Sequence, residues 1–130
     1  DHRRIEILRG ADAFILPSLV EGLSLSLLEA MACGTACIAT DAGADGEVLE
    51  NGAGIVIGTQ RVAQQLRTIL PLLNNHPEML AILSSKARQR VLARYTLSKN
   101  ITQLENLYAQ IVPSKARYSV PQRVRWIEQF

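Results

Sequence analysis

Residues 17–34, PSLVEGLSLSLLEAMACG, decide the fold that we expect for this chain. The apolar run Ala13–Leu16 precedes this stretch and stops at its proline, which is typical of a buried parallel strand. Ser24 is a favourable N-cap residue and Gly34 a favourable C-terminal one, so the sequence predicts a helix over residues 25–33. Because this helix is apolar nearly all round, we expect it to be buried.

Strands and helices continue to alternate on both sides of this stretch. Upstream, residues 3–10 are expected to form a short helix, and downstream Ala36–Ala39 and Ile55–Ile57 read as buried strands around a helical turn at Gly46–Glu50. This order predicts βαβ units, hence a parallel sheet with right-handed crossovers. The fold class is therefore α/β: a partial Rossmann-like domain with a short parallel sheet flanked by helices.

Three amphipathic helices are expected after the third strand. The first begins at Val62, and Pro71 is expected to bend or shorten it. The second begins at Pro77 and runs to about Arg94, and the third stops at Pro113. Three strands are fewer than an open doubly wound sheet usually has, so we infer that upstream strands belong to the same domain.

The domain organisation that follows from these elements has two parts. Residues 1–113 form the Rossmann-like portion, and residues 114–130 form a tail that ends in a short helix after Pro121. The apolar arc of that last helix includes Trp126, so we expect it to pack on a neighbouring chain or on the uncovered sheet edge; the alternative is that it folds onto its own domain as an ordinary last helix.

Composition excludes several classes of protein. The chain has 130 residues, of which 48% are hydrophobic and 20% charged, which fits one folded domain rather than a disordered segment. The net charge of +2 is small and its arginines are scattered, so nucleic acid is not expected as a partner. No apolar run approaches the roughly 18 residues of a membrane span, and the start carries no secretory signal. The two cysteines, Cys33 and Cys37, read as small core residues in a reducing compartment.

The start of the predicted helix at residue 25 forms a candidate anion site. Ligands of open α/β sheets bind at the carboxyl ends of the strands, where the free N–H groups of Gly22, Leu23 and Ser24 would lie. The helix dipole adds positive potential there, which suits a phosphate or diphosphate. Gly22 would let the ligand approach the backbone closely.

Two carboxylates, Glu21 and Glu29, flank this helix start. They are eight positions apart, which spans at most ~12 Å on a helix. A carboxylate accepts from two neighbouring hydroxyls at once, so Glu29 suits a ribose diol and Glu21 the hydroxyls of a sugar. The alternative is structural: Glu21 would be a favourable negative charge beside the positive end of the helix dipole, and Glu29 would pair with an arginine. A charge within apolar sequence is costly without a partner, and the residues alone leave both interpretations open.

The stretch resembles the E-x7-E motif of the retaining family 4 glycosyltransferases, the glycosyl transferases group 1, which have the GT-B fold. The resemblance runs from about residue 5 to about residue 112. The matching positions are Leu16-Pro17-Ser18, Glu21-Gly22, Leu28-Glu29-Ala30-Met31-Ala32, Gly34 and Ala39-Thr40. It implies that the chain is the C-terminal, donor-binding half of such an enzyme, with a nucleotide-sugar donor, retention at the anomeric carbon and no cofactor or metal.

The resemblance also implies roles for individual residues. Glu21 falls on the catalytic position at the reacting end of the donor sugar, and Glu29 on the position that binds the nucleotide ribose. The diphosphate and the rest of the donor are assigned to Gly22, Leu23, Ser24 and Leu25. The chain departs from the family pattern after Thr40, where Gly43-Ala44-Asp45-Gly46-Glu47 replaces the usual Gly-Gly-x-Pro-Glu.

The expected function is therefore donor binding in an enzyme that transfers a sugar from a nucleotide-sugar to an acceptor during polysaccharide or glycolipid synthesis. The resemblance implies a cytoplasmic protein, with an N-terminal acceptor-binding domain as its partner and a membrane surface as a further one; this chain alone would be inactive. Two alternatives are a non-catalytic nucleotide-binding or scaffold module of the same fold and a GT-B nucleotide-sugar epimerase.

Two other groups of charged residues have ordinary interpretations. The acidic side chains between positions 41 and 50 are irregularly spaced and lie in a glycine-rich segment. We therefore expect them to stabilise turns rather than to bind a metal ion. Arg88, Arg90 and Arg94 are expected to form a solvated helix face, with a contact to an anionic membrane or an acceptor as the alternative.

Overall fold

The computed structural model describes residues 2–112, so the predicted tail helix after Pro121 lies outside the described residues. The chain divides into two units, residues 1–96 and the segment from residue 97 onward. The predicted boundary at residue 113 stays a prediction.

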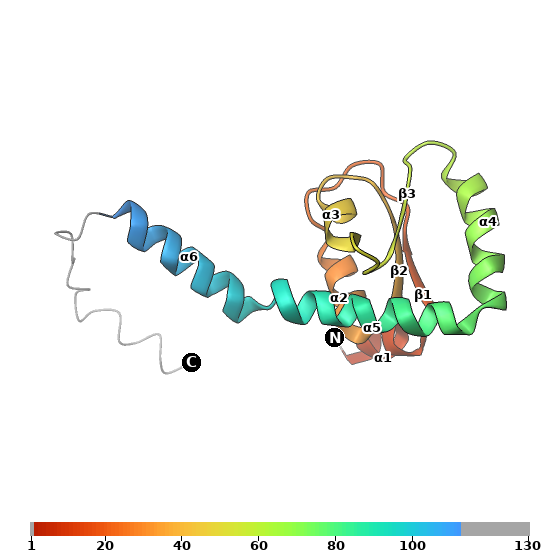
Figure 1. The fold of residues 1–130 in the computed structure, drawn as a ribbon, viewed down its shortest axis with the longest axis horizontal. Helices are drawn as coiled ribbons and strands as arrows, with labels where there is room; N and C mark the ends of the chain where they lie inside the picture. The colour runs from red at the N-terminus through yellow and green to blue at the C-terminus, as the bar shows by residue number, and fades with distance from the viewer. Residues whose placement is uncertain (1, 113–130) are drawn as a thin grey trace. The chain divides into compact units, whose positions relative to one another are not determined.

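The first unit is an α/β domain, as the sequence predicts (Figure 1). Its sheet has three parallel strands in the order β1-β2-β3, with Ala13 beside Ala36 and Ile38 beside Ile55. In chain order its elements are α1 (His2–Gly10), β1 (Ala13–Leu16), α2 (Leu25–Cys33), β2 (Ala36–Thr40), α3 (Asp45–Leu49), β3 (Ile55–Ile57), α4 (Val62–Asn75) and α5 (Pro77–Arg94).

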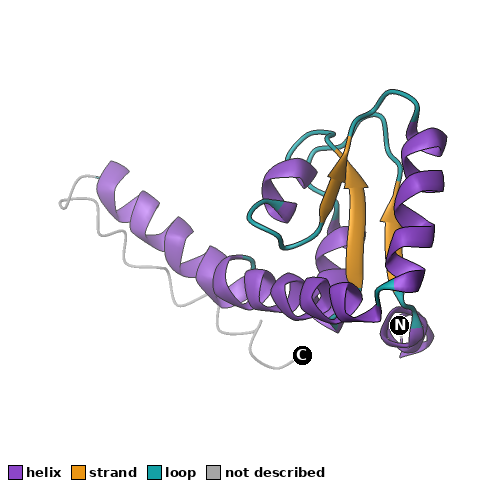
Figure 2. Cartoon of the chain, turned by 45° about the vertical axis from the view of Figure 1, so that its right-hand side comes forward, coloured by secondary structure: helices purple, strands orange, loops and turns teal. Residues whose placement is uncertain are grey.

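The strands separate two hydrophobic cores, because successive side chains of a strand point to opposite faces. On one face, Phe14, Cys37 and Ala39 pack with α2, α3 and the middle of α5. On the other face, Ile15 and Ile38 pack with α4 and the start of α5. Figure 2 shows the strands between α4 on one side and α2 and α3 on the other. Both faces of β2 are covered, and all five of its residues are buried.

The predicted caps of α2 are confirmed. The Ser24 hydroxyl accepts a hydrogen bond from the Leu27 amide, and Gly34 ends the helix in the left-handed conformation at φ 76°. Leu27, Ala30 and Met31 are buried, whereas Leu25 is 72% exposed. The expectation that the helix is buried all round is therefore wrong for its first turn, because that turn lies at the loop edge of the sheet.

Pro71 does not shorten α4, which continues to Asn75. The shortening that we expected as one of the two effects of this proline is wrong, because burial holds the turn that follows: Leu73 is only 3% exposed and packs in the core with Leu80 and Leu83 of α5. That apolar contact offsets the backbone hydrogen bond that a proline removes from a helix interior.

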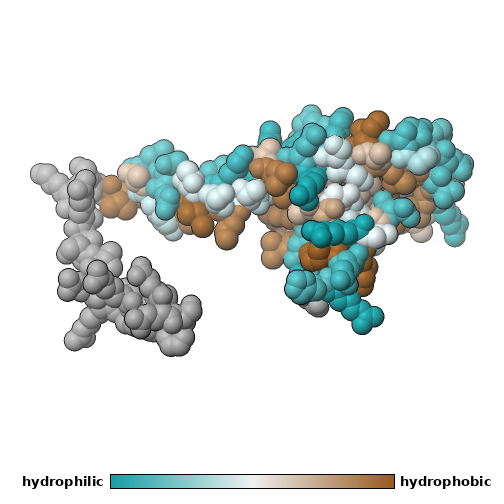
Figure 3. Space-filling model, turned by 90° about the horizontal axis from the view of Figure 1, so that it is seen from below, coloured by the Kyte–Doolittle hydropathy of each residue, from teal (hydrophilic) through white to brown (hydrophobic). Residues whose placement is uncertain are grey.

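The second unit contains α6 (Leu97–Ile111), and none of the residues of this helix is buried. Its apolar side chains recur every three or four residues, so they form one stripe along the helix, which Figure 3 shows as a row of hydrophobic residues. The stripe consists of Leu97, Ile101, Leu104, Tyr108 and Ile111. Within residues 2–112, no helix combines the length and the hydrophobicity that crossing a bilayer requires.

Candidate functional site

The candidate site lies at the carboxyl edge of the sheet, where the loop of residues 17–24 leaves β1 and the loop of residues 41–44 leaves β2. Thr40 is the last residue of β2. Its hydroxyl group lies within hydrogen-bonding distance of two carbonyl oxygens, that of Leu16, at 3.4 Å, and that of Ser18. The Asp41 amide donates to the Ile57 carbonyl at the end of β3, at 2.8 Å. The Thr40 side chain and the Asp41 amide therefore connect the carboxyl ends of all three strands by hydrogen bonds.

The two loops are also hydrogen-bonded directly to each other. The Ala44 amide donates to the Gly22 carbonyl at 2.8 Å, and the Ser24 amide donates to the Asp45 carboxylate at 3.0 Å. Gly43 has φ 57°, and a Cβ at this position would lie 2.0 Å from the Glu21 carbonyl oxygen. Only glycine permits this approach, so the loop that carries Glu21 is held by the loop after β2.

Glu21 is half-buried and its carboxylate is oriented from within its own loop. The Ser18 hydroxyl donates to Glu21 Oε1 at 2.8 Å. A carboxylate has lone pairs for about four hydrogen bonds, so the other oxygen and the remaining lone pair can accept from ligand hydroxyls. The geometry gives Glu21 a fixed position while leaving it acceptor capacity.

Glu29 lies just over one turn into α2 and is paired with an arginine. Arg4 of α1 places Nη2 2.8 Å from Glu29 Oε1, and the two side chains are 57% and 35% exposed. This is the ion pair that the structural alternative expects. An ion pair this exposed contributes little to stability, because water screens it. A ligand that offers hydroxyls can therefore compete with Arg4 for the carboxylate.

The amides before α2 are not equally available to a ligand. The Ser24 amide already donates to Asp45, so an anion would reach it only by displacing that carboxylate. Gly22 and Leu23 are exposed, and a Cβ added at Gly22 would meet no heavy atom of the described chain within 4 Å. The space beside Gly22 is open. Leu25, at the first position of α2, is exposed beside this loop.

Asp45 is the residue that sequence reasoning missed. It is 1% exposed, its Oδ1 accepts from the Ser24 amide, and its Oδ2 is buried with no hydrogen-bond partner in the described chain. Burial raises the pKa of this carboxyl, the Ser24 amide lowers it, and the nearby charge of Glu21 raises it further. The available signal was the departure from the family pattern at residues 43–47, but an aspartate in a glycine-rich segment is typical of a turn.

The remaining reactive groups do not form a second catalytic centre in the described residues. Burial raises the pKa of the Cys37 thiol to about 12, so this sulfur stays protonated at neutral pH and is a poor nucleophile. Within residues 2–112, no three histidine, cysteine or carboxylate side chains gather in an arrangement that holds a metal ion. The chemistry at the carboxyl edge is thus hydrogen bonding by two carboxylates and by backbone amides.

A parallel sheet whose carboxyl edge carries these loops defines a Rossmann-like α/β domain of the kind found in GT-B glycosyltransferases. The chain belongs to the family described as Glycosyl transferases group 1, whose family model matches residues 1–90. The matched region contains both loops and both carboxylates of the E-x7-E stretch.

Curated relatives are similar over most of this chain. It is 34% identical to an N-acetyl-alpha-D-glucosaminyl L-malate synthase from Bacillus anthracis, over 82% of this chain and 28% of that protein. It is 26% identical to a UDP-Gal:alpha-D-GlcNAc-diphosphoundecaprenol alpha-1,3-galactosyltransferase from Escherichia coli, over 84% of this chain and 28% of that protein. The chain thus spans little more than a quarter of the length of these two relatives.

Solved structures show the same fold. A sucrose-phosphate synthase from Thermosynechococcus elongatus superposes with a TM-score of 0.75 at 27% identity, over 85% of this chain and 28% of that one. The C-terminal domain of a glycosyl transferase group 1 family protein from Francisella tularensis superposes with a TM-score of 0.64 at 28% identity, over 70% of this chain and 47% of that one. The second match agrees with the expected place of this chain in the C-terminal half of the fold.

Proposed function

We propose that this chain binds the nucleotide-sugar donor in a retaining glycosyltransferase, with the donor along the loop of residues 17–24 and the start of α2. The observation that carries the proposal is the locked loop at the carboxyl edge, which holds Glu21 beside open space in a chain of the group 1 family. A preorganised loop favours catalysis because it adds no reorganisation cost when charge develops on the donor.

Three parts of a nucleotide-sugar have a matching group in this arrangement: the sugar, the diphosphate and the ribose. Glu21 would accept from the hydroxyls of the sugar at the reacting end, and its bond from Ser18 would keep it in place. The exposed amides of Gly22 and Leu23 would donate to the diphosphate, where the N-terminus of α2 adds positive potential. Glu29 would exchange the Arg4 guanidinium for the two hydroxyls of the ribose.

The rest of the reaction needs groups that this chain does not supply. An acceptor-binding N-terminal domain would provide the other wall of the cleft, and the transfer would need no metal or cofactor. We place the enzyme in the cytoplasm, in contact with the membrane surface when its acceptor is a lipid. The Escherichia coli relative is named for a diphosphoundecaprenol acceptor, which supports a lipid acceptor of this type.

The second candidate is a non-catalytic nucleotide-binding or scaffold module of the same fold. It is favoured by one observation: Glu29 and the Ser24 amide both have partners within the chain, Arg4 and Asp45. If those contacts persist when nucleotides are present, the motif serves the fold and not a donor.

Steady-state kinetics of the intact protein with a panel of nucleotide-sugars distinguish the two. If Glu21 acts at the reacting sugar, Glu21→Gln lowers kcat by more than it raises KM, because the lost contact strengthens as charge develops. A variant with unchanged kcat and a raised KM would assign Glu21 to ground-state binding. Donor binding without transfer to any acceptor would favour the non-catalytic module.

A further inference from the structure

A pocket with charged and amide side chains in its lining lies away from the carboxyl edge, between α5 and the segment that joins α3 to β3. Its volume is about 310 Å³, and it is lined by Asn51, Ala53, Lys86, Gln89, Arg90 and Ala93. Because residues 51–53 precede β3 whereas residues 17–24 follow β1, this pocket and the candidate donor site belong to opposite ends of the parallel strands.

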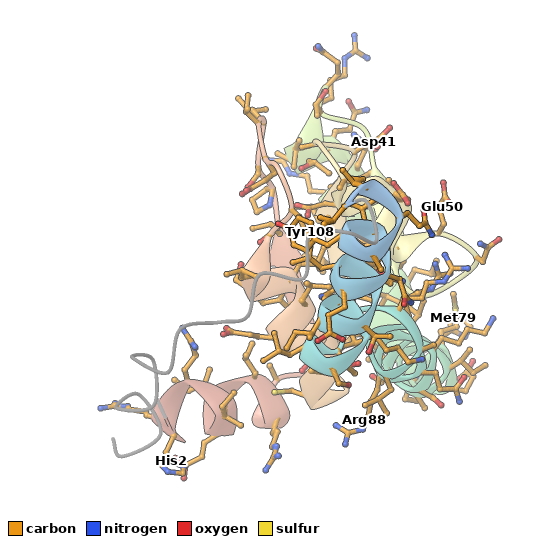
Figure 4. The ribbon with its side chains drawn as sticks, turned by 90° about the vertical axis from the view of Figure 1, so that its left-hand side faces the viewer. His2, Asp41, Glu50, Met79, Arg88 and Tyr108 are labelled. Carbon is orange, nitrogen blue, oxygen red and sulfur yellow. The ribbon has the colours of Figure 1, made fainter. Side chains whose placement is uncertain are left out.

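The pocket has two cations without acidic partners. Neither Lys86 nor Arg90 forms an ion pair in the described part of the chain, although Glu50 is the residue next to Asn51. Arg90 donates from Nη2 to the Glu50 carbonyl oxygen at 2.7 Å, so its guanidinium is held by a backbone group and not by a carboxylate. Figure 4 labels Glu50, the residue whose carbonyl oxygen accepts this bond, and Arg88, which precedes Arg90 by two residues in α5.

Arg90 also has an unsatisfied donor. Its Nη1 is buried and has no hydrogen-bond partner among the described residues. A buried donor without a partner costs free energy, and the cost is greater for a charged group. A site lined by this guanidinium therefore favours a ligand that brings oxygen acceptors to it.

The loop geometry places the second cation beside the turn. Asn51 and Gly52 are both left-handed, at φ 57° and 78°, which turns the chain back toward α5. A Cβ added at Gly52 would lie only 3.1 Å from Lys86 Nζ, so the ammonium lies directly over the glycine backbone. The absence of a side chain at residue 52 leaves room for the lysine head at the pocket.

We propose that this pocket binds a phosphate group. A guanidinium fork and an ammonium are the side chains that bind phosphate oxygens most strongly, and the Asn51 and Gln89 amides add neutral donors. The pocket is larger than one phosphate needs, so the group belongs to a larger molecule: a soluble sugar phosphate or a phosphate lipid headgroup. This site does not depend on the proposed donor site, since it shares no residue with it.

The test is a titration of the isotope-labelled chain with inorganic phosphate, followed by amide NMR. The expected result is saturable shifts of the amides of residues 50–53 and 86–93, with no such shifts at residues 21–29. Lys86→Gln removes one charge and disturbs no hydrogen bond of the described chain, and it is expected to weaken phosphate binding about tenfold. Arg67→Gln, which removes an exposed cation of α4 outside the pocket, is the matched control and is expected to change nothing.

Flotation with vesicles distinguishes the two sources of the phosphate. Binding to phosphatidylcholine vesicles that contain phosphatidic acid, lost in Lys86→Gln and kept in Arg67→Gln, assigns the pocket to a lipid headgroup. Phosphate binding by NMR without flotation assigns it to a soluble ligand. The proposal is overturned if phosphate gives no saturable shifts at the pocket, if chloride at equal ionic strength gives the same shifts, or if the two variants lose affinity equally.

Discussion

The helices α2 and α6 both carry apolar side chains, but only α2 buries them: α2 is apolar nearly all round, whereas α6 has one apolar stripe. In α2, Leu27, Ala30 and Met31 are completely buried, whereas α6 has no buried residue at all. Leu104, in the middle of the α6 stripe, is 48% exposed. The caps predict α2 and the period of the apolar residues predicts α6, but neither signal predicts whether a helix has a partner.

The difference follows from where each helix stands in the chain. α2 connects two adjacent parallel strands, so the sheet that it packs against is formed by the residues directly before and after it. α6 follows α5, with no strand after β3 in residues 2–112, and it belongs to a unit of its own. Its stripe needs a surface that the local sequence does not supply.

The largest expected effect tests this contrast directly. Leu27→Ala should destabilise the chain by about 2–5 kcal/mol, because it leaves a cavity between α2 and the sheet. Leu104→Ala, the matched change in α6, should shift the midpoint of urea unfolding very little, since the side chain is half exposed in the folded state. Equal losses in the two variants would show that α6 is buried in solution and would break the comparison.

The next effect concerns the loop of residues 17–24, which leads into α2. Gly43→Ala should cost about 1–3 kcal/mol for the left-handed backbone alone, and the new Cβ would clash with the Glu21 carbonyl oxygen. The loop of residues 17–24 must then move. We expect lower thermal stability together with shifted amide resonances at residues 21–24, while Gly10→Ala, at a glycine with open space around it, should leave those resonances in place. Unchanged loop resonances in Gly43→Ala would contradict the locked loop.

A smaller effect depends on pH and on Asp45, which anchors the start of α2. Its pKa is raised by burial, so the protonated carboxyl stabilises the fold at low pH and this contribution is lost as the pH rises through the raised value. Asp45→Asn keeps an oxygen for the Ser24 amide and carries no charge. The melting temperature of the variant minus that of the natural chain should therefore increase from about pH 4 to about pH 7. A difference that stays constant over this range would contradict the buried, unpaired carboxylate.

Local sequence signals predicted the elements around the site but not the contacts across it. The caps Ser24 and Gly34 predicted both ends of α2, because the hydrogen bonds of a cap reach residues no more than four positions away. The contact between Ser24 and Asp45 and the ion pair between Arg4 and Glu29 join residues more than 20 positions apart. Such contacts depend on how the loops fold over the sheet edge, which no local pattern contains.

The same limit explains the errors at Pro71 and Leu25. The shortening expected at Pro71 rests on backbone chemistry alone, whereas the burial of Leu73 in α4 arises from packing against α5. Leu25 is apolar but stands at the first position of α2, at the edge where the loops leave the strands, and stays exposed. In both cases the tertiary position of the residue overrides its local preference.

The central claim is that the carboxylates of the α2 region bind a nucleotide-sugar, and calorimetry of the intact protein with its preferred donor tests it most directly. Glu29→Ala removes an acceptor for the ribose hydroxyls and should weaken donor binding about tenfold or more, because hydrogen bonds to charged groups contribute roughly 1.5–3 kcal/mol. Glu29→Gln should lose less, and Glu105→Ala, which removes an exposed carboxylate of α6, should lose nothing. Donor affinity that is the same in all three variants and in the natural protein would contradict the account.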